Sequence, residues 1–462
     1  MGLADFPAKE FMDFTRIRKI SFGLKKPAPT LAAGFQAGEA GVGEVAALPQ
    51  NRLLAKQQSP AVEVTSFAST AEPVSIIALV NGLVQRAHAL RSSDIHIDPS
   101  STGVRIRFRV DGVMQEQENL PKKIHGEIIS RIKILADLRT DEHQAAQDGR
   151  FRIQTEEGLQ VDVRVSIAPT YHGENAVMRL LADKAEDFSL VSLGFSKGNR
   201  EKILNAIKRP FGMILATGPT GSGKTTTLYT LIRMLNKPEV SIVTIEDPIE
   251  YAIDGIEQIQ ANSRTGLTFA NGLRSILRQD PDIIMVGEIR DEETAGIAVN
   301  TALTGHLLFS TLHTNDAATT LPRLLDMKIE AFLIASTVNV AIGQRLVRKI
   351  CSHCKTPKVI SPMELKSLSE ILPADLLGKN RSFFYGKGCE DCNNSGYRGR
   401  VGIHEVLVPD EKVREAILRK ASASEIRQIA IEKGMVTLLE DGFEKATEGI
   451  TTIEEILRTL HE

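Results

Sequence analysis

The chain contains 462 residues, 42% of them hydrophobic and 25% charged, with a formal net charge of −2 at pH 7. Such a length exceeds what one hydrophobic core supports and predicts about two to four domains of ordinary globular composition. The near-zero charge argues against a protein that coats nucleic acid. No apolar run approaches the roughly 18–20 residues of a membrane span, and no signal peptide opens the chain. We therefore expect a cytosolic protein that meets a membrane only through a partner.

Residues 1–70 are rich in Ala, Gly, Pro, Gln and Ser and carry little periodicity, which predicts a flexible tail or linker. One segment, Phe11–Phe22, spaces four apolar residues near the helical period with basic residues between them. It is either disordered or a short basic amphipathic helix that docks on a partner or on lipid.

Residues 73–185 are predicted to form a compact α+β domain. Apolar residues recur at helical spacing over 76–87, and the pair Asp111-Gly112 after an alternating run marks a turn. The remaining predicted elements of this domain are strands at 94–98 and 104–110, a helix at 123–138, and strands at 151–153, 161–167 and 176–181.

The most informative motif is Gly-Pro-Thr-Gly-Ser-Gly-Lys-Thr over residues 218–225. It follows the apolar run Met213–Ala216, a predicted buried strand, and precedes a predicted helix that must end before Pro238. Glycines let successive N–H groups curl around phosphate oxygens, and the helix start adds its positive dipole end. In this pattern the lysine reaches the β/γ-phosphates and the threonine hydroxyl ligates Mg²⁺. We expect ATP or another nucleoside triphosphate to bind to Gly218, Pro219, Thr220, Gly221, Ser222, Gly223, Lys224, Thr225 and Thr226.

Further strands are predicted at 241–245, 283–286 and 307–310, which together with Met213–Ala216 indicate a parallel sheet within residues 198–344. Acidic residues follow two of these strands, at the edge where the phosphate loop should lie. Acids placed there hold Mg²⁺-bound water or orient the attacking water. The candidates are Glu246, Asp247, Glu250 and Glu288.

Two histidines flank the last of these strands. His306 precedes it and His313 follows it, and each is either a structural histidine or a group that senses the γ-phosphate.

Arginines form another candidate set. Arg164 and Arg179 lie on predicted strands of the first domain, and Arg274 and Arg278 are spaced to share a helix face. Each alone is typical of a surface ion pair, yet the planar guanidinium also suits a phosphate supplied by a neighbouring subunit. The alternating arginines of 105–109 resemble a nucleic-acid ribbon, but aromatic content of 5% favours a solvated or interface face.

All four cysteines fall into two C-x-x-C pairs, Cys351/Cys354 and Cys389/Cys392, within a module of residues 345–402. In a cytosolic chain this pattern favours one tetrahedral Zn²⁺ site over a redox pair or free thiols. The long segment between the pairs must form a loop or small helical insert. Residues 403–462 are predicted to be mostly helical.

Together these motifs resemble the secretion-superfamily ATPases that assemble type II secretion systems and type IV pili. The resemblance runs from about Pro73 to the C-terminus and is specific. Besides the phosphate loop and the cysteines, it is carried by Ser93–Ile97, Gln147–Phe151, an aspartate box at Ile245–Glu250, a variant Walker B at Ile283–Glu288 and a histidine box at Gly305–Asn315.

The resemblance implies an α/β protein, with a PAS-like α+β domain hinged against a RecA-like ATPase core and six chains in a ring. Glu288 would be the Walker B acid and Glu250 the acid that polarises water, with the choice of general base left open. Arg164 and Arg179 would approach phosphate from the first domain, and Arg274 and Arg278 match a second arginine pair. ATP turnover would then drive an inner-membrane platform protein that builds a pilus or pseudopilus.

Two other functions compete with an assembly motor. One is a DNA-uptake or DNA-transfer ATPase of the same superfamily, and the other is an ATP-gated scaffold with little turnover. The cysteine module favours assembly, because retraction motors and conjugation-type ATPases generally lack it. Many assembly motors carry a separate folded domain where this chain has its Ala/Gly/Pro-rich tail, so docking and regulation are expected to differ.

Overall fold

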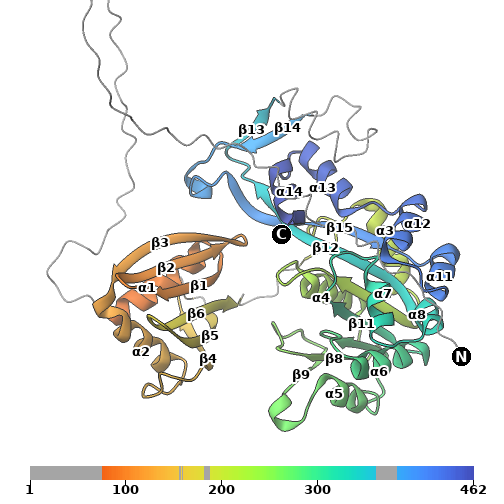
Figure 1. Cartoon of the computed structure of the whole chain (residues 1–462), viewed down its shortest axis with the longest axis horizontal. Coiled ribbons are helices and arrows are strands. Elements are labelled where there is room, and N and C mark those ends of the chain that lie inside the picture. Colours follow the sequence, from red (N-terminus) through yellow and green to blue (C-terminus); the bar gives the residue numbers. More distant parts are fainter. Residues whose placement is uncertain (1–74, 156–157, 159, 182–187, 360–381, 462) are drawn as a thin grey trace, which may run out of the picture. The chain divides into compact units, whose positions relative to one another are not determined.

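A computed structural model describes residues 75–461 except 156–157, 159, 182–187 and 360–381 (Figure 1). The tail 1–70 and its segment Phe11–Phe22 therefore lie outside the described residues. Within the described ranges, no helix combines the length and the apolar character that crossing a bilayer requires.

The first domain is a six-stranded antiparallel sheet in the order β3-β2-β1-β6-β5-β4. Helix α1 begins where the Ser75 side chain accepts a hydrogen bond from the Ala78 N–H. Of the apolar residues predicted from their spacing, Ile76 is only partly buried and the others are buried. Asp111 and Gly112 adopt φ values of 49° and 85°, as a two-residue hairpin turn requires. The elements are α1 (Ile76–Ala89), β1 (Ser92–Pro99), β2 (Gly103–Val110), β3 (Val113–Pro121), α2 (His125–Leu135), β4 (Gln147–Gln154), β5 (Gln160–Thr170) and β6 (Gly173–Leu181).

The second sheet has seven strands in the order β15-β12-β7-β11-β10-β8-β9, in which only the edge strand β15 is antiparallel to its neighbour. Its strands are β7 (Gly212–Thr217), β8 (Ile242–Glu246), β9 (Glu257–Gln260), β10 (Ile283–Val286), β11 (Leu307–Leu312), β12 (Val338–Ile350) and β15 (Tyr397–Leu407). All four strands predicted for this sheet are present. The domain boundary expected at 344/345 falls inside β12, so the sheet continues into the cysteine module.

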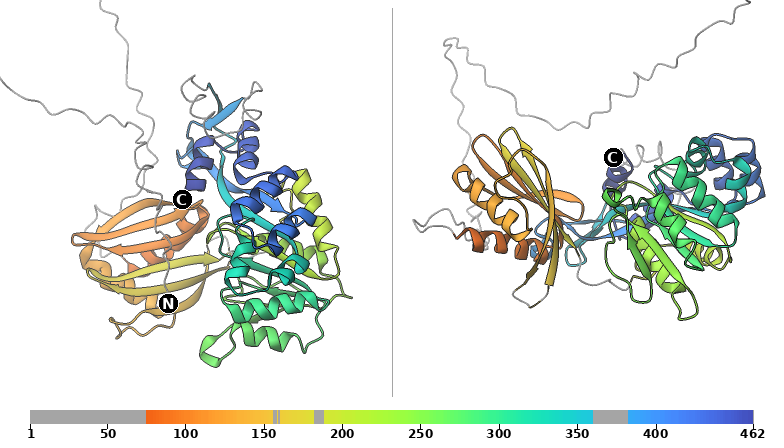
Figure 2. Two further views of the ribbon diagram at one scale, coloured as in Figure 1. Left: turned by 45° about the vertical axis from the view of Figure 1, so that its right-hand side comes forward. Right: turned by 90° about the horizontal axis from the view of Figure 1, so that it is seen from below.

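Helices cover both faces of this sheet (Figure 2). Alternate residues of β7 enter two different cores: Met213 and Leu215 pack on one face, Ile214 and Ala216 on the other. A strand buried on both faces must be apolar throughout, which explains its unbroken hydrophobic run. The helices of this part are α3 (Lys197–Ile207), α4 (Lys224–Leu235), α5 (Phe269–Ile276), α6 (Glu292–Leu303), α7 (Thr320–Asp326) and α8 (Ala331–Thr337).

The cysteine module adds a two-stranded antiparallel sheet. The predicted boundary at 402/403 falls inside β15, and helices follow from Glu411 to the end of the described residues. These elements are β13 (Lys355–Lys358), β14 (Phe383–Gly386), α11 (Glu411–Leu418), α12 (Ala423–Glu432), α13 (Leu438–Thr447) and α14 (Ile453–His461). Residues 360–381, where an insert between the two cysteine pairs was expected, lie outside the described ranges.

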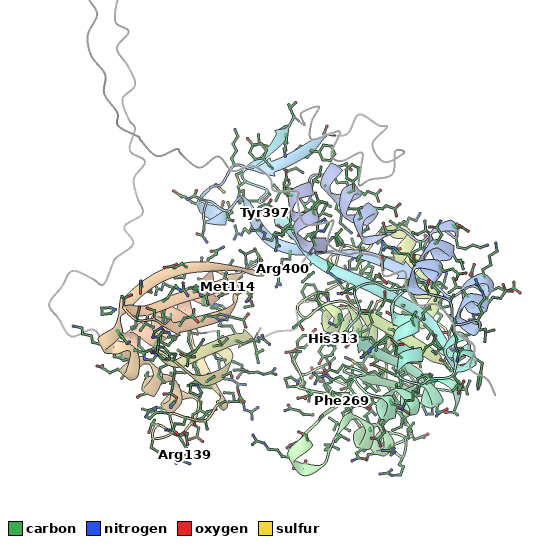
Figure 3. The ribbon with its side chains drawn as sticks, in the orientation of Figure 1. Met114, Arg139, Phe269, His313, Tyr397 and Arg400 are labelled. Atoms are coloured by element: carbon green, nitrogen blue, oxygen red, sulfur yellow. The ribbon has the colours of Figure 1, made fainter. Side chains whose placement is uncertain are left out.

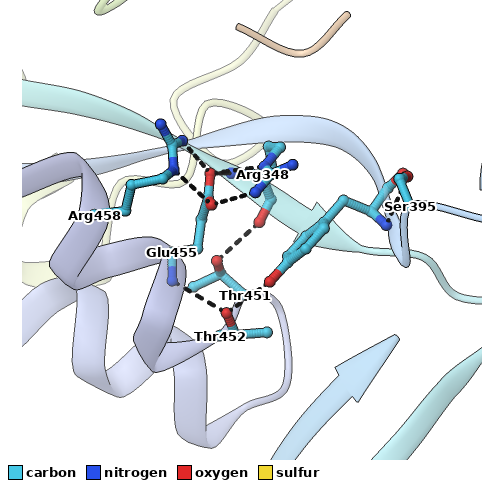
Figure 4. Close-up of polar contacts among 7 residues, drawn as sticks. Arg348, Ser395, Thr451, Thr452, Glu455 and Arg458 are labelled. Atoms are coloured by element: carbon cyan, nitrogen blue, oxygen red, sulfur yellow. Dashed lines mark hydrogen bonds and ion pairs between the residues drawn. The ribbon is translucent and has the colours of Figure 1, made fainter. Parts of the chain in front are cut away.

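A buried carboxylate anchors the last helix to the large sheet (Figure 4). Glu455 on α14 has a side chain only 1% exposed, and it accepts hydrogen bonds from Arg348 on β12 at 2.7 Å and from Arg458. Burial by itself would raise the pKa of Glu455, but the two guanidinium groups outweigh it and lower that pKa to about 2. The ion pairs therefore hold α14 against β12.

Replacing this carboxylate tests the anchor. Glu455→Gln should cost about 3 kcal/mol of unfolding free energy at pH 7, because the partly buried guanidinium groups of Arg348 and Arg458 lose the charge of Glu455. Since the folded-state pKa is depressed, the stabilisation is complete above about pH 4.5 and is lost as the pH falls toward 2. The difference in unfolding free energy between wild type and variant should therefore shrink as the pH is lowered from about 4.5 toward 2. Urea unfolding followed by circular dichroism measures it.

The neighbouring Glu454→Gln provides a matched control. Its carboxylate is 60% exposed and pairs with Lys358, so the loss should stay below about 1 kcal/mol. Equal losses for the two variants would contradict the anchor.

Candidate functional site

The phosphate loop begins where β7 ends, between two neighbouring strands. Thr217, the last residue of β7, pairs with Leu312 on β11 and with Gly343 on β12. The next strand in sequence, β8, lies beyond β11 and β10. Such a reversal of strand order leaves a crevice at the carboxyl edge of a parallel sheet. The loop predicted to bind phosphate lies at that edge.

Two glycines give the loop its shape. Gly218 has a φ of 147°, and a Cβ there would stand 2.5 Å from the carbonyl oxygen of Gln344. Gly223 adopts the left-handed conformation at the N-cap of α4, where no side chain caps the helix. The first N–H groups of α4 are thus left for another acceptor, and a phosphate is a suitable one.

Lys224 lies within the curve of the loop. Its Nζ donates hydrogen bonds to the carbonyl oxygens of Gly218 at 2.8 Å and Pro219 at 3.0 Å. Burial lowers the pKa of Lys224 to about 8, while the charge of Glu288 acts in the opposite direction. The charges of Lys224 and Glu288 therefore interact at the loop.

Glu288 and His313 are also brought together. Glu288 follows β10, its side chain is 11% exposed, and its Oε2 lies 3.1 Å from Nε2 of His313, which follows β11. Figure 3 labels His313. Arg290 pairs with the other carboxylate oxygen. The two predicted groups from neighbouring strand ends form one polar cluster beside the loop.

His306 lies elsewhere. Its carbonyl accepts a hydrogen bond from the N–H of Gly212, the first residue of β7, and its Nδ1 lies 3.3 Å from the carbonyl of Thr301. Six residues of strand, roughly 20 Å, separate that end of β7 from the phosphate loop. The structure does not bring His306 to the loop of its own chain.

The acids of the aspartate box differ in exposure. Glu246 is buried, and its carboxylate accepts hydrogen bonds from Tyr229, Thr244 and Gln258. Asp247 is exposed, and the side chain of Glu250 is 43% exposed. Glu250 therefore has oxygens available for water, whereas those of Glu246 are occupied by protein donors.

The four predicted arginines each have a protein partner. Arg164 donates to the carbonyl of Ile249 at 2.7 Å and lies 3.6 Å from Glu250. The other contacts are Arg179 with Asp94 at 2.9 Å, Arg274 with Glu293 at 2.8 Å, and Arg278 with the carbonyl of Arg274 at 2.9 Å. Helix α5 ends at Ile276, so Arg278 lies beyond the helix face it was expected to share.

Sequence reasoning missed two polar residues that contact the loop region. Thr217 joins the loop to the histidine box: its hydroxyl donates to the carbonyl of Thr314 at 3.0 Å and accepts from the Thr314 N–H at 3.1 Å. Gln344 on β12 contacts the loop from the other side. Polar residues inside apolar runs were the available signal for both.

The four cysteines converge. Their sulfur atoms all lie within 4.8 Å of one another, with separations of 3.7 Å for Cys351/Cys389, 3.8 Å for Cys354/Cys392 and 3.6 Å for Cys389/Cys392. Four thiolates about 2.3 Å from a tetrahedral Zn²⁺ stand about 3.8 Å apart. The N–H groups of Cys389 and Gly396 also donate to the Cys392 sulfur, which favours a thiolate. The donor set fits zinc.

Removing one thiol tests this fit. Cys392→Ser should reduce bound zinc, measured by mass spectrometry of purified protein, from about one equivalent to near zero and should lower the thermal midpoint, because a structural zinc contributes folding free energy. Thr356→Val, a change on β13 beside the cluster, should keep its zinc. Full zinc occupancy and an unchanged midpoint in Cys392→Ser would rule out the site.

Comparisons with known proteins agree with these motifs. A family described as type II/IV secretion system protein matches residues 69–458. Type II secretion system protein E of Xanthomonas campestris pv. campestris is 47% identical over 398 residues, which are 86% of this chain and 69% of that protein. The type IV pilus assembly ATPase PilB of Thermus thermophilus is 47% identical over 378 residues, 82% of this chain and 42% of that protein.

Solved structures resemble the fold. The ATPase DotB of Legionella pneumophila matches with a TM-score of 0.61 and 24% identity, over 84% of this chain and 96% of that one. The pilus retraction motor PilT with bound ADP matches with a TM-score of 0.55 and 26% identity, over 82% and 96%.

Proposed function

The chain belongs to the type II/IV secretion system protein family, and we propose that it is a Mg²⁺-dependent ATPase that works as a homo-hexameric motor for pilus or secretion-apparatus assembly. One observation carries the proposal. Lys224, Glu288 and His313 gather from three strand ends beside a glycine loop whose helix start is uncapped. That combination supplies the positioning and charge neutralisation on which phosphoryl transfer depends.

Each group has a separate task in this proposal. The loop N–H groups and Lys224 bind the phosphates, and the half-exposed Glu250 orients the attacking water. Glu288 is oriented by His313 at 3.1 Å, which couples the histidine box to the Walker B acid. Thr225 and Glu288 would hold Mg²⁺, which supplies charge neutralisation on the phosphate oxygens.

The predicted arginines are proposed to reach the nucleotide when the first domain closes. Arg164 already lies beside Glu250 at 3.6 Å. We assign Arg179, Arg274 and Arg278 as phosphate ligands that closure of the first domain, or a neighbouring subunit, brings to the nucleotide. Arg179 would then leave Asp94, its present partner at 2.9 Å.

The names of the relatives support a role in secretion or pilus assembly. Proteins 43–47% identical to this chain are named for type II secretion and for type IV pilus assembly. We propose that this chain likewise acts on the cytoplasmic side of the inner membrane, through a platform protein. The zinc module supports assembly over retraction.

Glu288→Gln tests the chemistry. The amide keeps the shape of the carboxylate but removes its charge, so turnover measured by phosphate release should fall by about 100-fold or more, while affinity for a fluorescent ATP analogue changes little. Glu292→Gln is the matched control: this exposed glutamate pairs with Lys328 outside the site and should leave turnover unchanged. Wild-type turnover in Glu288→Gln would remove Glu288 from the mechanism.

A further inference from the structure

Gln344 is a buried polar residue that the motifs above do not include. It lies on β12, one residue after Gly343, which pairs with Thr217 at the end of β7. Its exposed fraction is 1%. A buried amide at the strand beside the phosphate loop must find partners there, because an unpaired amide is costly to bury.

The partners lie in the loop and in the helix that follows it. The Gln344 Nε2 donates to the carbonyl oxygen of Ser222 at 2.7 Å, and the Thr227 hydroxyl donates to the Gln344 Oε1 at 2.9 Å. A carbonyl oxygen can only accept, so the orientation of the amide is determined by its partners. One side chain thus holds a loop carbonyl turned inward and ties it to the first turns of α4.

Gln344 also limits the space beside two glycines of the loop. A Cβ on Gly218 would stand 2.5 Å from the Gln344 carbonyl oxygen, and a Cβ on Gly223 would stand 3.1 Å from its Nε2. The first and the last glycine of the loop therefore both pack on this one residue. The hydrogen bond from Gln344 thereby fixes the Ser222 carbonyl toward β12.

We propose that Gln344 is a positioning residue for nucleoside di- and triphosphates, whose buried amide holds the phosphate loop in its binding shape. The proposal rests on the nucleotide-binding function proposed above. Gln344 acts through the loop backbone, and the loop contacts phosphate alike in the ground state and the transition state. Loss of the amide should therefore raise KM and Kd while leaving kcat nearly unchanged.

A near-isosteric pair of variants separates positioning from general stability. Gln344→Met removes both hydrogen bonds and should weaken binding of a fluorescent ADP by about tenfold. Asn339→Leu is the matched control on the same strand. Asn339 is 4% exposed and its amide bridges the Phe211 carbonyl and Arg209, about 16 Å from Gln344. Asn339→Leu should lower the thermal midpoint about as much as Gln344→Met does, and it should leave ADP affinity within twofold of wild type.

Gln344→Glu gives a second, independent readout. The carboxylate keeps the Thr227 bond but opposes the Ser222 carbonyl with an acceptor, so ADP affinity relative to wild type should fall at pH 8. Because position 344 is buried, the pKa of the introduced carboxyl group should be raised, so lowering the pH from 8 to 6 should favour the protonated form. The protonated form has an O–H donor, so the ratio of variant to wild-type affinity should move back toward one.

The outcomes are distinct. A raised Kd in Gln344→Met with normal binding in Asn339→Leu, or a pH-dependent ratio in Gln344→Glu, supports positioning. Wild-type affinity in Gln344→Met, or in Gln344→Glu at pH 8, overturns it. Absence of ADP and ATP binding by the wild-type protein would instead refute the proposed function.

Discussion

The site depends on the register of β7 between its two parallel neighbours. Thr217 pairs with Leu312 on one side and Gly343 on the other. The phosphate loop, the histidine box and Gln344 therefore lie next to one another at the carboxyl end of β7. Hydrogen bonds between the Thr217 hydroxyl and the main chain of Thr314 stabilise this alignment of β7 with β11. A one-residue slip would turn alternate side chains to the opposite face. The hydrogen bonds between the Thr217 hydroxyl and Thr314 would then be lost.

The acids at this edge differ in burial and in their hydrogen-bond partners. The carboxylate of Glu246 is held by Tyr229, Thr244 and Gln258, and burial together with the charge of Glu246 raises the pKa of Tyr229, which keeps that hydroxyl a donor. A carboxylate saturated by protein donors stabilises the strand end and has little capacity left for water. Glu250, only four residues later, keeps its oxygens accessible. A buried, fully hydrogen-bonded acid and an accessible acid thus occur within one short motif.

Sequence patterns predicted the strands that are apolar on both faces, such as β7, and the residue clusters at their carboxyl ends. They did not reveal β12 or β15, because these strands carry polar residues such as Gln344, His404 and Glu405 that only tertiary partners make buried. The placement of His306 shows a second reason why sequence patterns alone do not define the site. Local spacing identifies a residue near a strand, whereas the end of the sheet that it occupies depends on how strands separated in sequence are paired.

Strand β12 connects the phosphate loop to the cysteine module and to the last helix. Gln344 touches the phosphate loop, Arg348 holds Glu455 of α14, and Cys351 follows the end of the strand. Both edges of β12 are hydrogen-bonded, to β7 and to β15. A strand paired on both sides cannot shift alone without breaking ladders on each side, so the start of the cysteine module and the last helix are built on the same rigid sheet as the nucleotide loop. Any motion that ATP turnover produces must therefore arise at elements outside this sheet, and the first domain, whose Arg164 contacts the aspartate box, is such an element.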